Sequence, residues 1–241
     1  IDRSAYKSLL PLDAIIMAGG QGVRLRPLTL TTPKPLLKVG FKPIIEHNID
    51  RLKSFGIQHI KICINYLGEQ LVSYFGDGTE KDLIIDYVEE KEPLGTIGAL
   101  RLVSHYENDS LLIMNSDLLT TIDFEDIYQE FVNSKADMIV ATTPYEVKIP
   151  YGVVETKGNE VVSLSEKPIY TYYSNAGIYI VKKEIVDLIP ENEHFNATDL
   201  MERLFQMKKK VINYPILDYW LDIGKPHDYE KAQRDIKHLD L

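Results

Sequence analysis

The first 141 residues alternate between short apolar runs and longer segments in which apolar positions recur with helical spacing. The apolar runs have the length of strands and occupy residues 14–18, 60–64, 83–88, 111–114 and 138–141. The helical segments occupy residues 44–55, 95–103 and 124–133. This alternation predicts an α/β fold, with helices on both faces of a mostly parallel mixed sheet. Ligands of such sheets bind beyond the carboxyl ends of the strands.

After about residue 150 the pattern changes to short strands at 152–156, 161–164 and 175–181. Helices are predicted near Val186 and at 198–207, and a last strand and helix follow. Residues 13–241 are therefore predicted to form a single domain, which suits a chain of 241 residues. Residues 1–12 precede the first strand and are predicted to form a tail or linker.

Three glycines follow the first predicted strand, namely Gly19, Gly20 and Gly22. Glycine permits positive φ and lets phosphate oxygens approach backbone N–H groups without a Cβ in the way. Two cations come next. The guanidinium of Arg24 can donate paired hydrogen bonds to a pyrophosphate, and Lys34 lies between two prolines that stiffen its backbone. The glycines alone would indicate only a turn. Together with the cations they predict a site for a nucleoside triphosphate.

The segment 17–35, which reads MAGGQGVRLRPLTLTTPKP, resembles the opening motif of the sugar-phosphate nucleotidyltransferases. Enzymes of that family join a sugar 1-phosphate to a nucleoside triphosphate and release pyrophosphate. The resemblance continues at intervals to residue 229 and departs from the family pattern at Val23, where Thr is usual, and at Lys225. It implies the nucleotide-diphospho-sugar transferase fold, a Rossmann-like three-layer α/β/α sandwich. The nucleotide-binding half is expected over residues 13–120 and the sugar-binding half over 121–241.

The resemblance also implies roles for individual residues. Asp117, which follows the strand at 111–114, and Asp222 are expected to hold Mg²⁺, whose preference for octahedral oxygen ligands they suit. An isolated aspartate at a strand end is more often a turn or capping residue, so the prediction depends on the pair. The expected catalytic residues are Arg24, Lys34, Lys167, Asp117 and Asp222. The expected nucleotide-binding residues are Ala18, Gly19, Gly20, Gly22, Glu90, Gly95 and Thr96, and the expected sugar-binding residues are Tyr151, Gly152, Glu166, Asn175 and Gly177.

Glu90 lies five residues before Gly95, where family members specific for uracil or thymine tend to have Gln. An ionised carboxylate only accepts hydrogen bonds, so it suits the adjacent N1–H and N2–H₂ donors of guanine and repels the carbonyls of uracil. We therefore expect GTP, and the branch of the family that acts on glucosamine, mannose or heptose 1-phosphate. The alternatives are that Glu90 belongs to a solvent-exposed acidic run, and that the chain is a uridylyl- or thymidylyltransferase.

Two other classes of protein remain to be weighed. A glycosyltransferase on a similar sheet usually has Asp-x-Asp after the fourth strand, where this chain has Asn115-Ser116-Asp117-Leu118. A non-catalytic homologue that binds a nucleotide sugar and regulates a partner would be expected to have lost cations or metal ligands, and all of them are present. Catalysis, in the biosynthesis of surface glycans, is the expectation.

Composition adds limits. The net charge of −9 argues against nucleic-acid binding, and no run approaches the ~20 apolar residues of a membrane span. One cysteine, Cys63, excludes an internal disulfide, and a cytoplasmic setting is expected. The triplet Asn196-Ala-Thr198 is expected to place a helix N-cap at Thr198. Residues 1–12 are compatible with a linker from preceding regulatory modules of the cystathionine-β-synthase (CBS) type, and the oligomeric state is left open, with a homo-oligomer among the options.

Overall fold

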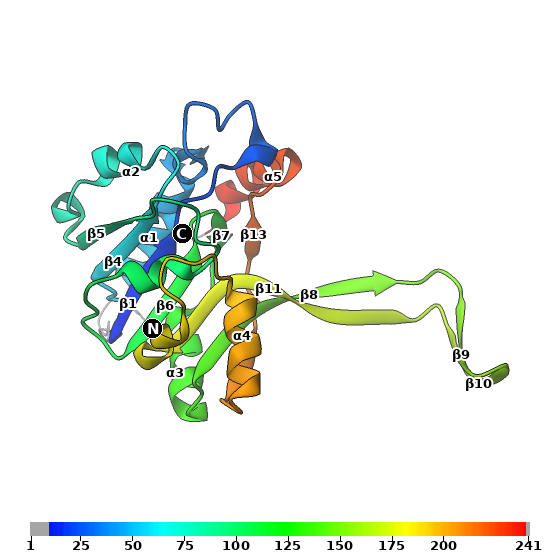
Figure 1. The fold of residues 1–241 in the computed structure, drawn as a ribbon. Helices are drawn as coiled ribbons and strands as arrows, with labels where there is room; N and C mark the ends of the chain where they lie inside the picture. Colours follow the sequence, from blue (N-terminus) through cyan, green and yellow to red (C-terminus); the bar gives the residue numbers. More distant parts are fainter. Residues whose placement is uncertain (1–9, 240–241) are drawn as a thin grey trace, which may run out of the picture.

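The computed structural model describes residues 10–239, so the first nine residues of the predicted tail lie outside the described part of the chain. A seven-stranded sheet in the order β12-β8-β11-β6-β1-β4-β5 forms the centre (Figure 1). Its strands are β1 (Leu12–Met17), β4 (His59–Ile64), β5 (Ile84–Glu89), β6 (Ser110–Asn115), β8 (Met138–Lys148), β11 (Ile169–Lys182) and β12 (Val211–Pro215). β11 runs antiparallel to both of its neighbours, β6 and β8, and the other pairs are parallel. The predicted mostly parallel mixed sheet is confirmed.

The sheet is buried on both faces. Along β1, Ala14 and Ile16 pack into one hydrophobic cluster and Ile15, between them, packs into another. The first cluster includes side chains of α1 (Ile44–Ser54), α2 (Gly68–Phe75) and α3 (Phe124–Ser134), and the second includes side chains of α4 (Ala197–Gln206) and the short 3₁₀ helices η5 (Gly98–Leu102) and η6 (Lys183–Leu188). Burial on both faces explains why the strands read as continuous apolar runs.

The helices differ from the expectations in four places. The segment 95–103 and the segment near Val186 form only 3₁₀ turns, and α2 was not predicted. The N-cap of α4 is Asn196 rather than Thr198, because Asn196 and Asp199 form a reciprocal capping box. No helix among residues 10–239 combines the length and apolarity needed to cross a membrane.

Short strand pairs complete the fold. β7 (Leu118–Thr120) pairs antiparallel with β13 (Trp220–Asp222), and β2 (Lys38–Val39) pairs with β3 (Lys42–Pro43). Helix α5 (Pro226–Asp235) packs through Ala232 into a third cluster together with Leu119 of β7 and Leu221 of β13. The pairing of β7 with β13 joins the chain after β6 to a segment about 100 residues later.

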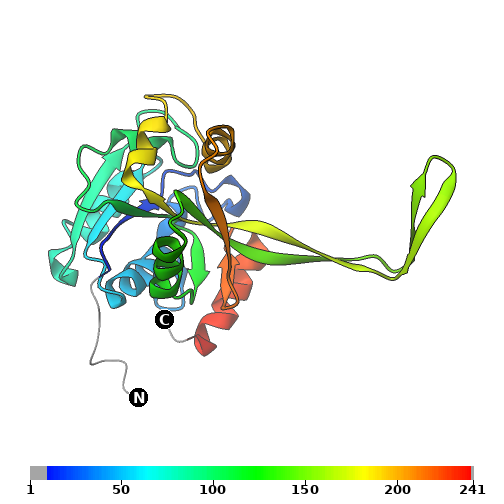
Figure 2. The same cartoon turned by 90° about the horizontal axis from the view of Figure 1, so that it is seen from below.

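A long arm leaves this body (Figures 1 and 2). It consists of residues 143–174: the ends of β8 and β11 remain paired beyond the sheet, and β9 (Gly152–Lys157) and β10 (Glu160–Glu166) form a hairpin that bends away at the tip. Every residue of the arm is exposed except Thr143, Ile149, Val153 and Pro168, which are half-buried. The arm therefore buries almost none of its surface against the described part of the body.

Candidate active site

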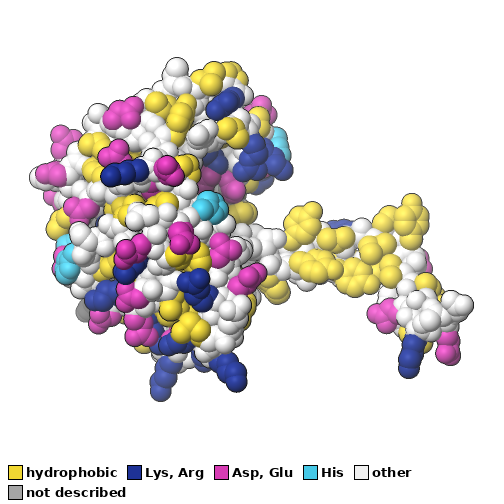
Figure 3. All heavy atoms as spheres, in the orientation of Figure 1, with side chains coloured by type: hydrophobic (Ala, Val, Ile, Leu, Met, Phe, Trp, Pro, Cys, Tyr) yellow, Lys and Arg dark blue, Asp and Glu magenta, His cyan; other side chains and the backbone are white. Residues whose placement is uncertain are grey.

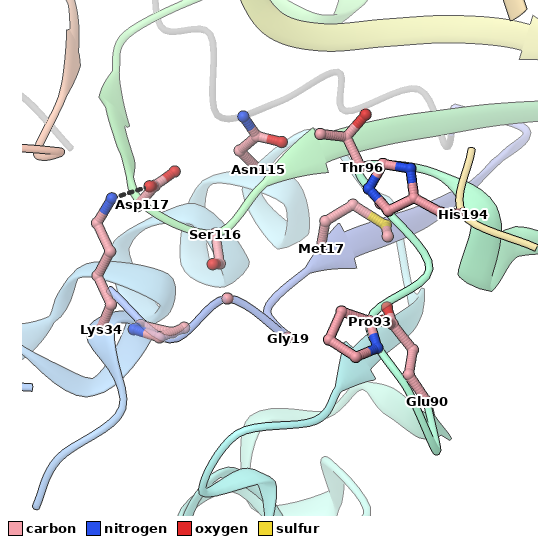
Figure 4. A pocket seen from close by; sticks show the side chains of 13 residues that line it. Met17, Gly19, Lys34, Glu90, Pro93, Thr96, Asn115, Ser116, Asp117 and His194 are labelled. Carbon is pink, nitrogen blue, oxygen red and sulfur yellow. Dashed lines mark hydrogen bonds and ion pairs between the residues drawn. The ribbon is translucent and has the colours of Figure 1, made fainter. Parts of the chain in front are cut away.

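A pocket lies at the carboxyl ends of β1 and β6, the edge where the α/β architecture predicts a ligand (Figure 4). The loop after β5 forms one wall, and the segment that contains Lys34 forms the opposite wall. We call it the central pocket. Its lining residues are Met17, Gly19, Gly20, Lys34, Pro35, Glu90, Pro93, Gly95, Thr96, Asn115, Ser116, Asp117 and His194.

The glycine loop reaches the pocket through two of its three glycines. A Cβ on Gly20 would meet nothing within 4 Å, so the backbone there is open to a ligand. A Cβ on Gly19 would lie 3.2 Å from the Cβ of Asn65 and 3.5 Å from Oε1 of Glu90. Gly22 does not line the pocket: its φ is +61°, and a Cβ there would come within 2.9 Å of the Thr29 side chain. Gly22 shapes the turn, whereas Gly20 offers an approach to the backbone. Ala18, also predicted to bind nucleotide, is buried at the start of the loop, and its N–H donates to the carbonyl of Cys63.

Asp117, Asp222 and Lys34 form one charge cluster at the other end of the pocket. Lys34 makes an ion pair with Asp117, drawn in Figure 4, and its Nζ lies 3.6 Å from Oδ1 of Asp222. The strand pair β7–β13 holds the two aspartates together, because Asp222 is paired with Leu118 and the Ile223 N–H donates to the Asp117 carbonyl at 3.1 Å. The structure therefore brings together three of the five predicted catalytic residues.

Arg24 joins the same cluster from the glycine loop. A Cβ on Gly224 would come within 3.0 Å of Nη2 of Arg24 and 3.1 Å of Oδ1 of Asp222, so the missing side chain leaves room for both groups. Lys225 is exposed, as expected for a residue that points into solvent. Arg24 is the fourth predicted catalytic residue at this end of the pocket.

One carboxylate oxygen of Asp222 has no hydrogen-bond donor in the described part of the chain. Its Oδ1 is buried and accepts no hydrogen bond from the described residues. Burial, and then the negative charge of Asp117, raise the pKa of Asp222, although Lys34 and Arg24 oppose the shift. A buried carboxylate oxygen that accepts no hydrogen bond, beside a second carboxylate, fits a hard divalent cation. No group of three or more His, Cys, Asp or Glu residues that could hold a metal occurs within residues 10–239, so substrate oxygens and water would have to supply the other ligands.

Glu90 is buried in the wall of the pocket rather than exposed on the surface. Its Oε2 accepts a hydrogen bond from the Leu94 N–H at 3.1 Å, and its backbone carbonyl accepts one from Nδ2 of Asn65 at 2.6 Å. Burial raises the pKa of the Glu90 carboxyl, and the Leu94 N–H acts in the opposite direction. The interpretation of Glu90 as part of a solvated acidic run is wrong, whereas its neighbour Glu89 is exposed.

The loop that carries Gly95 and Thr96 is tied to the start of α4. Gly95 has a φ of +83°, and a Cβ there would come within 2.7 Å of the Phe195 carbonyl oxygen, so only glycine fits. The Thr96 hydroxyl accepts from the Ala197 N–H at 2.9 Å, and the Thr96 N–H donates to Oδ1 of Asn196 at 3.2 Å. This contact brings His194 into the lining of the pocket.

Asn175 and Gly177 lie where β11 crosses the end of β6. Gly177 has a φ of +71°, and a Cβ there would come within 2.5 Å of Nδ2 of Asn115, which lines the pocket. Oδ1 of Asn175 accepts from the Gly177 N–H and from the Tyr179 hydroxyl, both at 2.9 Å. These two predicted sugar-binding residues are therefore at the edge of the pocket and define the base of the arm.

The remaining predicted site residues are at the bend of the arm. Gly152 and Glu166 face each other across β9 and β10, and the Lys167 N–H donates to the Tyr151 carbonyl at 3.3 Å. Lys167 has a φ of +47°, which is uncommon for a residue with a side chain. Tyr151, Gly152, Glu166 and Lys167 thus form a cluster of their own, away from the central pocket of the same chain (Figure 1).

Six lining residues were not predicted. Asn115 and Ser116 directly precede Asp117 at the end of β6, and Met17 ends β1, so their positions at strand ends could have indicated them. Pro35 directly follows Lys34, and Pro93 lies between Glu90 and Gly95 in the sequence. His194 carries no such signal, because the contact between the loop at 94–97 and the start of α4 brings it there.

A glycine loop, two cations and paired carboxylates at the carboxyl edge of a parallel sheet define a nucleotide-dependent phosphoryl- or nucleotidyl-transferring α/β enzyme. The chain belongs to the nucleotidyl transferase family, whose model matches residues 13–238. The predicted family, fold class and class of enzyme, a sugar-1-phosphate nucleotidyltransferase, are confirmed.

Curated relatives carry guanylyltransferase names. The chain is 32% identical over 230 residues to D-glycero-alpha-D-manno-heptose 1-phosphate guanylyltransferase of Aneurinibacillus thermoaerophilus, a match that covers 94% of this chain and 99% of the relative. It is 31% identical over 231 residues to mannose-1-phosphate guanylyltransferase of Mycobacterium tuberculosis, with 93% of this chain and 64% of the relative covered. The chain therefore spans less than two thirds of the length of the latter.

Solved structures agree in fold. A putative glucose-1-phosphate thymidylyltransferase from Bacillus anthracis superposes with a TM-score of 0.78 at 26% identity, over 95% of this chain and 97% of that one. HddC from Yersinia pseudotuberculosis, complexed with GMP-PN, gives a TM-score of 0.72 at 25% identity, over 93% of this chain and 99% of that one. The fold is thus shared with a protein named as a putative thymidylyltransferase and with one solved in complex with GMP-PN.

Proposed function

We propose that this protein condenses a sugar 1-phosphate with GTP to give a GDP-sugar and pyrophosphate. The observation that carries the choice of GTP is the placement of the Glu90 carboxylate in the wall of the central pocket, beside Gly19 of the glycine loop. The guanylyltransferase names of the relatives support this choice. The alternative is a uridylyl- or thymidylyltransferase, which the thymidylyltransferase name of one structural neighbour keeps open.

Glu90 discriminates between bases by its hydrogen-bonding character. One oxygen is already engaged by the Leu94 N–H, which fixes the orientation of the carboxylate. A carboxylate accepts the N1–H and N2–H₂ donors of guanine in a fork, whereas the uracil edge presents carbonyl acceptors. Each such pair contributes about 1–3 kcal/mol of discrimination against the wrong base.

The reaction is an in-line attack by a phosphate oxygen of the sugar 1-phosphate on the α-phosphorus of GTP. The new P–O bond forms as the bond to pyrophosphate breaks, and the electron pair leaves with the pyrophosphate. No side chain has to remove a proton, because a phosphate monoester with a second pKa of about 6 is already largely ionised at neutral pH. The protein therefore supplies position and charge.

The residues of the pocket divide this work. The open backbone at Gly20 and the guanidinium of Arg24 hold the departing pyrophosphate, and Lys34 draws charge from the reacting phosphate. Asp117 and Asp222 hold the divalent metal, which we propose to be Mg²⁺. When bound, the ion neutralises phosphate charge and aligns the two substrates.

We assign the sugar phosphate to Glu166 and Lys167, with Tyr151, Gly152, Asn175 and Gly177 around it. The division into a nucleotide-binding half, 13–120, and a sugar-binding half, 121–241, stays a prediction, as do the cytoplasmic setting and the role in surface glycan biosynthesis. Which sugar binds depends on pocket shape. A CBS-type module before residue 13 also stays a prediction.

The first test measures pyrophosphate release from ATP, GTP, CTP, UTP and dTTP against glucosamine, mannose, glucose and heptose 1-phosphates, with Mg²⁺ and with chelator. We expect turnover with GTP and one sugar, abolished by chelator. Turnover with UTP or dTTP alone would retain the class of enzyme and reject GTP. Nucleotide binding without turnover for any pair would favour the regulatory homologue.

The second test isolates the base. Glu90→Gln should lower the preference for GTP over UTP by about 10–100-fold, because the amide presents one donor where guanine also donates. Glu89→Gln, the exposed neighbour, is the matched control and should leave the preference unchanged. An unchanged preference in Glu90→Gln would contradict the assignment.

A further inference from the structure

The arm carries an apolar face that nothing in the described chain covers. Residues that face each other across an antiparallel pair lie on the same side of the ribbon. Tyr145 faces Tyr172, and Val147 faces Tyr170, so these four side chains share one face. Their exposed fractions are 61%, 59%, 37% and 38% respectively. The opposite face carries the polar residues Glu146, Lys148 and Thr171 beside Tyr173 and Ile169. Figure 3 shows hydrophobic side chains along much of the arm.

A two-stranded ribbon of this kind is at best marginally stable alone in water, because it has no second layer on which to pack. The five tyrosines of the arm are Tyr145, Tyr151, Tyr170, Tyr172 and Tyr173. An aromatic side chain buries about 150–250 Å² in full, and about half of that is available here. Three of them, Tyr145, Tyr170 and Tyr172, share the apolar face, so covering these three in two arms would remove about 600 Å² from water, and the bends of the arms would have to bury the rest of a specific interface.

The central pocket lacks the residues that the arm carries. Lys34 is the one Lys or Arg among its lining residues, and it is already paired with Asp117 and near Asp222. A nucleoside triphosphate and a sugar phosphate together bring more negative charge than this lysine and Arg24 offset. Lys167, the cation we assign to the sugar phosphate, lies at the bend of the arm instead.

The arm cannot deliver Lys167 to its own pocket in this conformation. Eight residues of extended chain separate Lys167 from Asn175 at the edge of the pocket, about 27 Å at 3.4 Å per residue. The strand pairing is unbroken from Ile169–Lys148 to Asn175–Thr142 and resumes, after a register shift, at Tyr179–Val140, so the arm continues the central sheet. Folding it back would require both strands to bend sharply at that register shift.

The arm nevertheless begins at a pocket. Its base, Asn175 to Gly177, touches Asn115 in the pocket wall. Two copies related by a two-fold axis, with their arms running past each other, would each place the bend of the arm one arm length away, at the pocket of the other copy. Exchange of an identical element between protomers is an economical route to a symmetric dimer.

We propose that two copies of this chain exchange arms, and that Glu166 and Lys167 of each copy bind the sugar phosphate in the central pocket of the other. The assignment of Glu166 and Lys167 to the sugar phosphate rests on the proposed function; the exchange rests on the geometry and exposure of the arm. The active site is then composite, with the nucleotide end in the body of one copy and the sugar end on the arm of its partner.

The oligomeric state is the first test. Light scattering at micromolar concentration should give twice the chain mass of 27.6 kDa. Tyr172→Lys, on the apolar face, should shift the protein toward the monomer, and Thr171→Lys, on the opposite face of the same strand, should leave it dimeric. A wild-type monomer at these concentrations would overturn the proposal.

Complementation tests the composite site. Lys167→Ala and Asp117→Asn should each lose at least 100-fold in turnover as pure dimers. A heterodimer of the two, isolated from co-expression with two different tags, contains one site in which both residues are intact and should regain about half of the wild-type activity. If each site were built within one chain, the heterodimer would be as inactive as its parents, and arm exchange would be rejected.

Cross-linking gives a readout that does not depend on activity. One copy carries Lys167→Cys, the other carries Asn115→Cys, and a short thiol cross-linker is added; Cys63 is buried. We expect a cross-linked pair of about twice the chain mass, and none when Glu130→Cys, exposed on α3, replaces Asn115→Cys. A cross-link confined to single chains that carry both cysteines would show that the arm folds back. A cross-linked pair from a protein without turnover would retain the exchange and reject the proposed function.

Discussion

Strands β8 and β11 pass through two different environments. In the body, residues 138–141 and 176–181 are buried, and all of them except Gly177 belong to the hydrophobic clusters on either face of the sheet. In the arm, the same two strands remain hydrogen-bonded to each other while nearly all of their side chains are exposed. Backbone pairing is therefore preserved where packing is absent. The comparison teaches that the body is held by its own core, whereas the arm carries apolar surface for which its own chain provides no cover.

The largest expected effect is a loss of turnover when either aspartate of the charge cluster in the body is neutralised. Asp117→Asn and Asp222→Asn should each lower turnover by about 10³-fold or more, because we propose that the two carboxylates hold the metal at the reacting phosphates. GTP affinity should change by less than about 10-fold, since the glycine loop and Arg24 remain. Steady-state kinetics and equilibrium titration with GTP measure the two effects, and Asp218→Asn, an exposed aspartate before β13, is the control. An equal loss of GTP affinity and turnover would contradict the assignment.

A matched pair of substitutions in β11 compares the packing of the two regions. Ile180→Ala, in the buried part, should lower the free energy of unfolding by about 2–5 kcal/mol through lost burial and the cavity left behind. Ile169→Ala, in the arm with a side chain 57% exposed, should change it by less than about 0.5 kcal/mol. Chemical denaturation at two protein concentrations measures both. A cost at Ile169 that grows with concentration would mean that a second copy covers this residue as well.

Substitution of two glycines with positive φ, one in each region, compares how closely other atoms pack around the backbone there. Gly177→Ala should destabilise the protein by about 1–3 kcal/mol, because the new Cβ would come within 2.5 Å of Asn115 in addition to the strained backbone. Gly158→Ala, at the tip of the arm, should cost only about 1 kcal/mol, since a Cβ there meets nothing within 4 Å. Free energies of unfolding from denaturant titration give the difference. Equal costs would show that Asn115 moves away freely.

The smallest expected effect concerns ion pairs. Burial raises the pKa of Asp137, at the buried start of β8, but hydrogen bonds from Lys182 and from the Lys210 N–H outweigh it and hold the pKa below 3.8. A lowered pKa stabilises the folded state above pH 3.8 and ceases to do so as the pH falls through the lowered value. Asp137→Asn should therefore cost about 1–2 kcal/mol at pH 7 and less in acid. Glu146→Gln, which removes an exposed pair in the arm, should cost almost nothing at either pH.

Those parts of the site were predictable whose backbone conformation is fixed by neighbouring residues in the sequence. The buried run of β1 followed by Gly19 and Gly20 indicates a phosphate loop, since a glycine turn after a buried strand exposes backbone N–H groups whatever the rest of the chain does. The burial of Glu90 and the presence of His194 in the lining were not predictable in this way. They depend on the contact between the loop after β5 and the start of α4, which are about 100 residues apart.

The sequence by itself determined the α/β class and the family, and it predicted the residues that are proposed to bear the chemistry, because hydrophobic periodicity and short motifs are local properties. Only the tertiary structure decided where those residues meet. It joined Asp117 to Asp222 through the β7–β13 pair and buried the Glu90 carboxylate. It also carried Glu166 and Lys167 away from the central pocket on the arm. The physical reason is that strand pairing extends as far as the backbone can form hydrogen bonds, whereas burial requires a second layer, which the described chain does not supply for the arm.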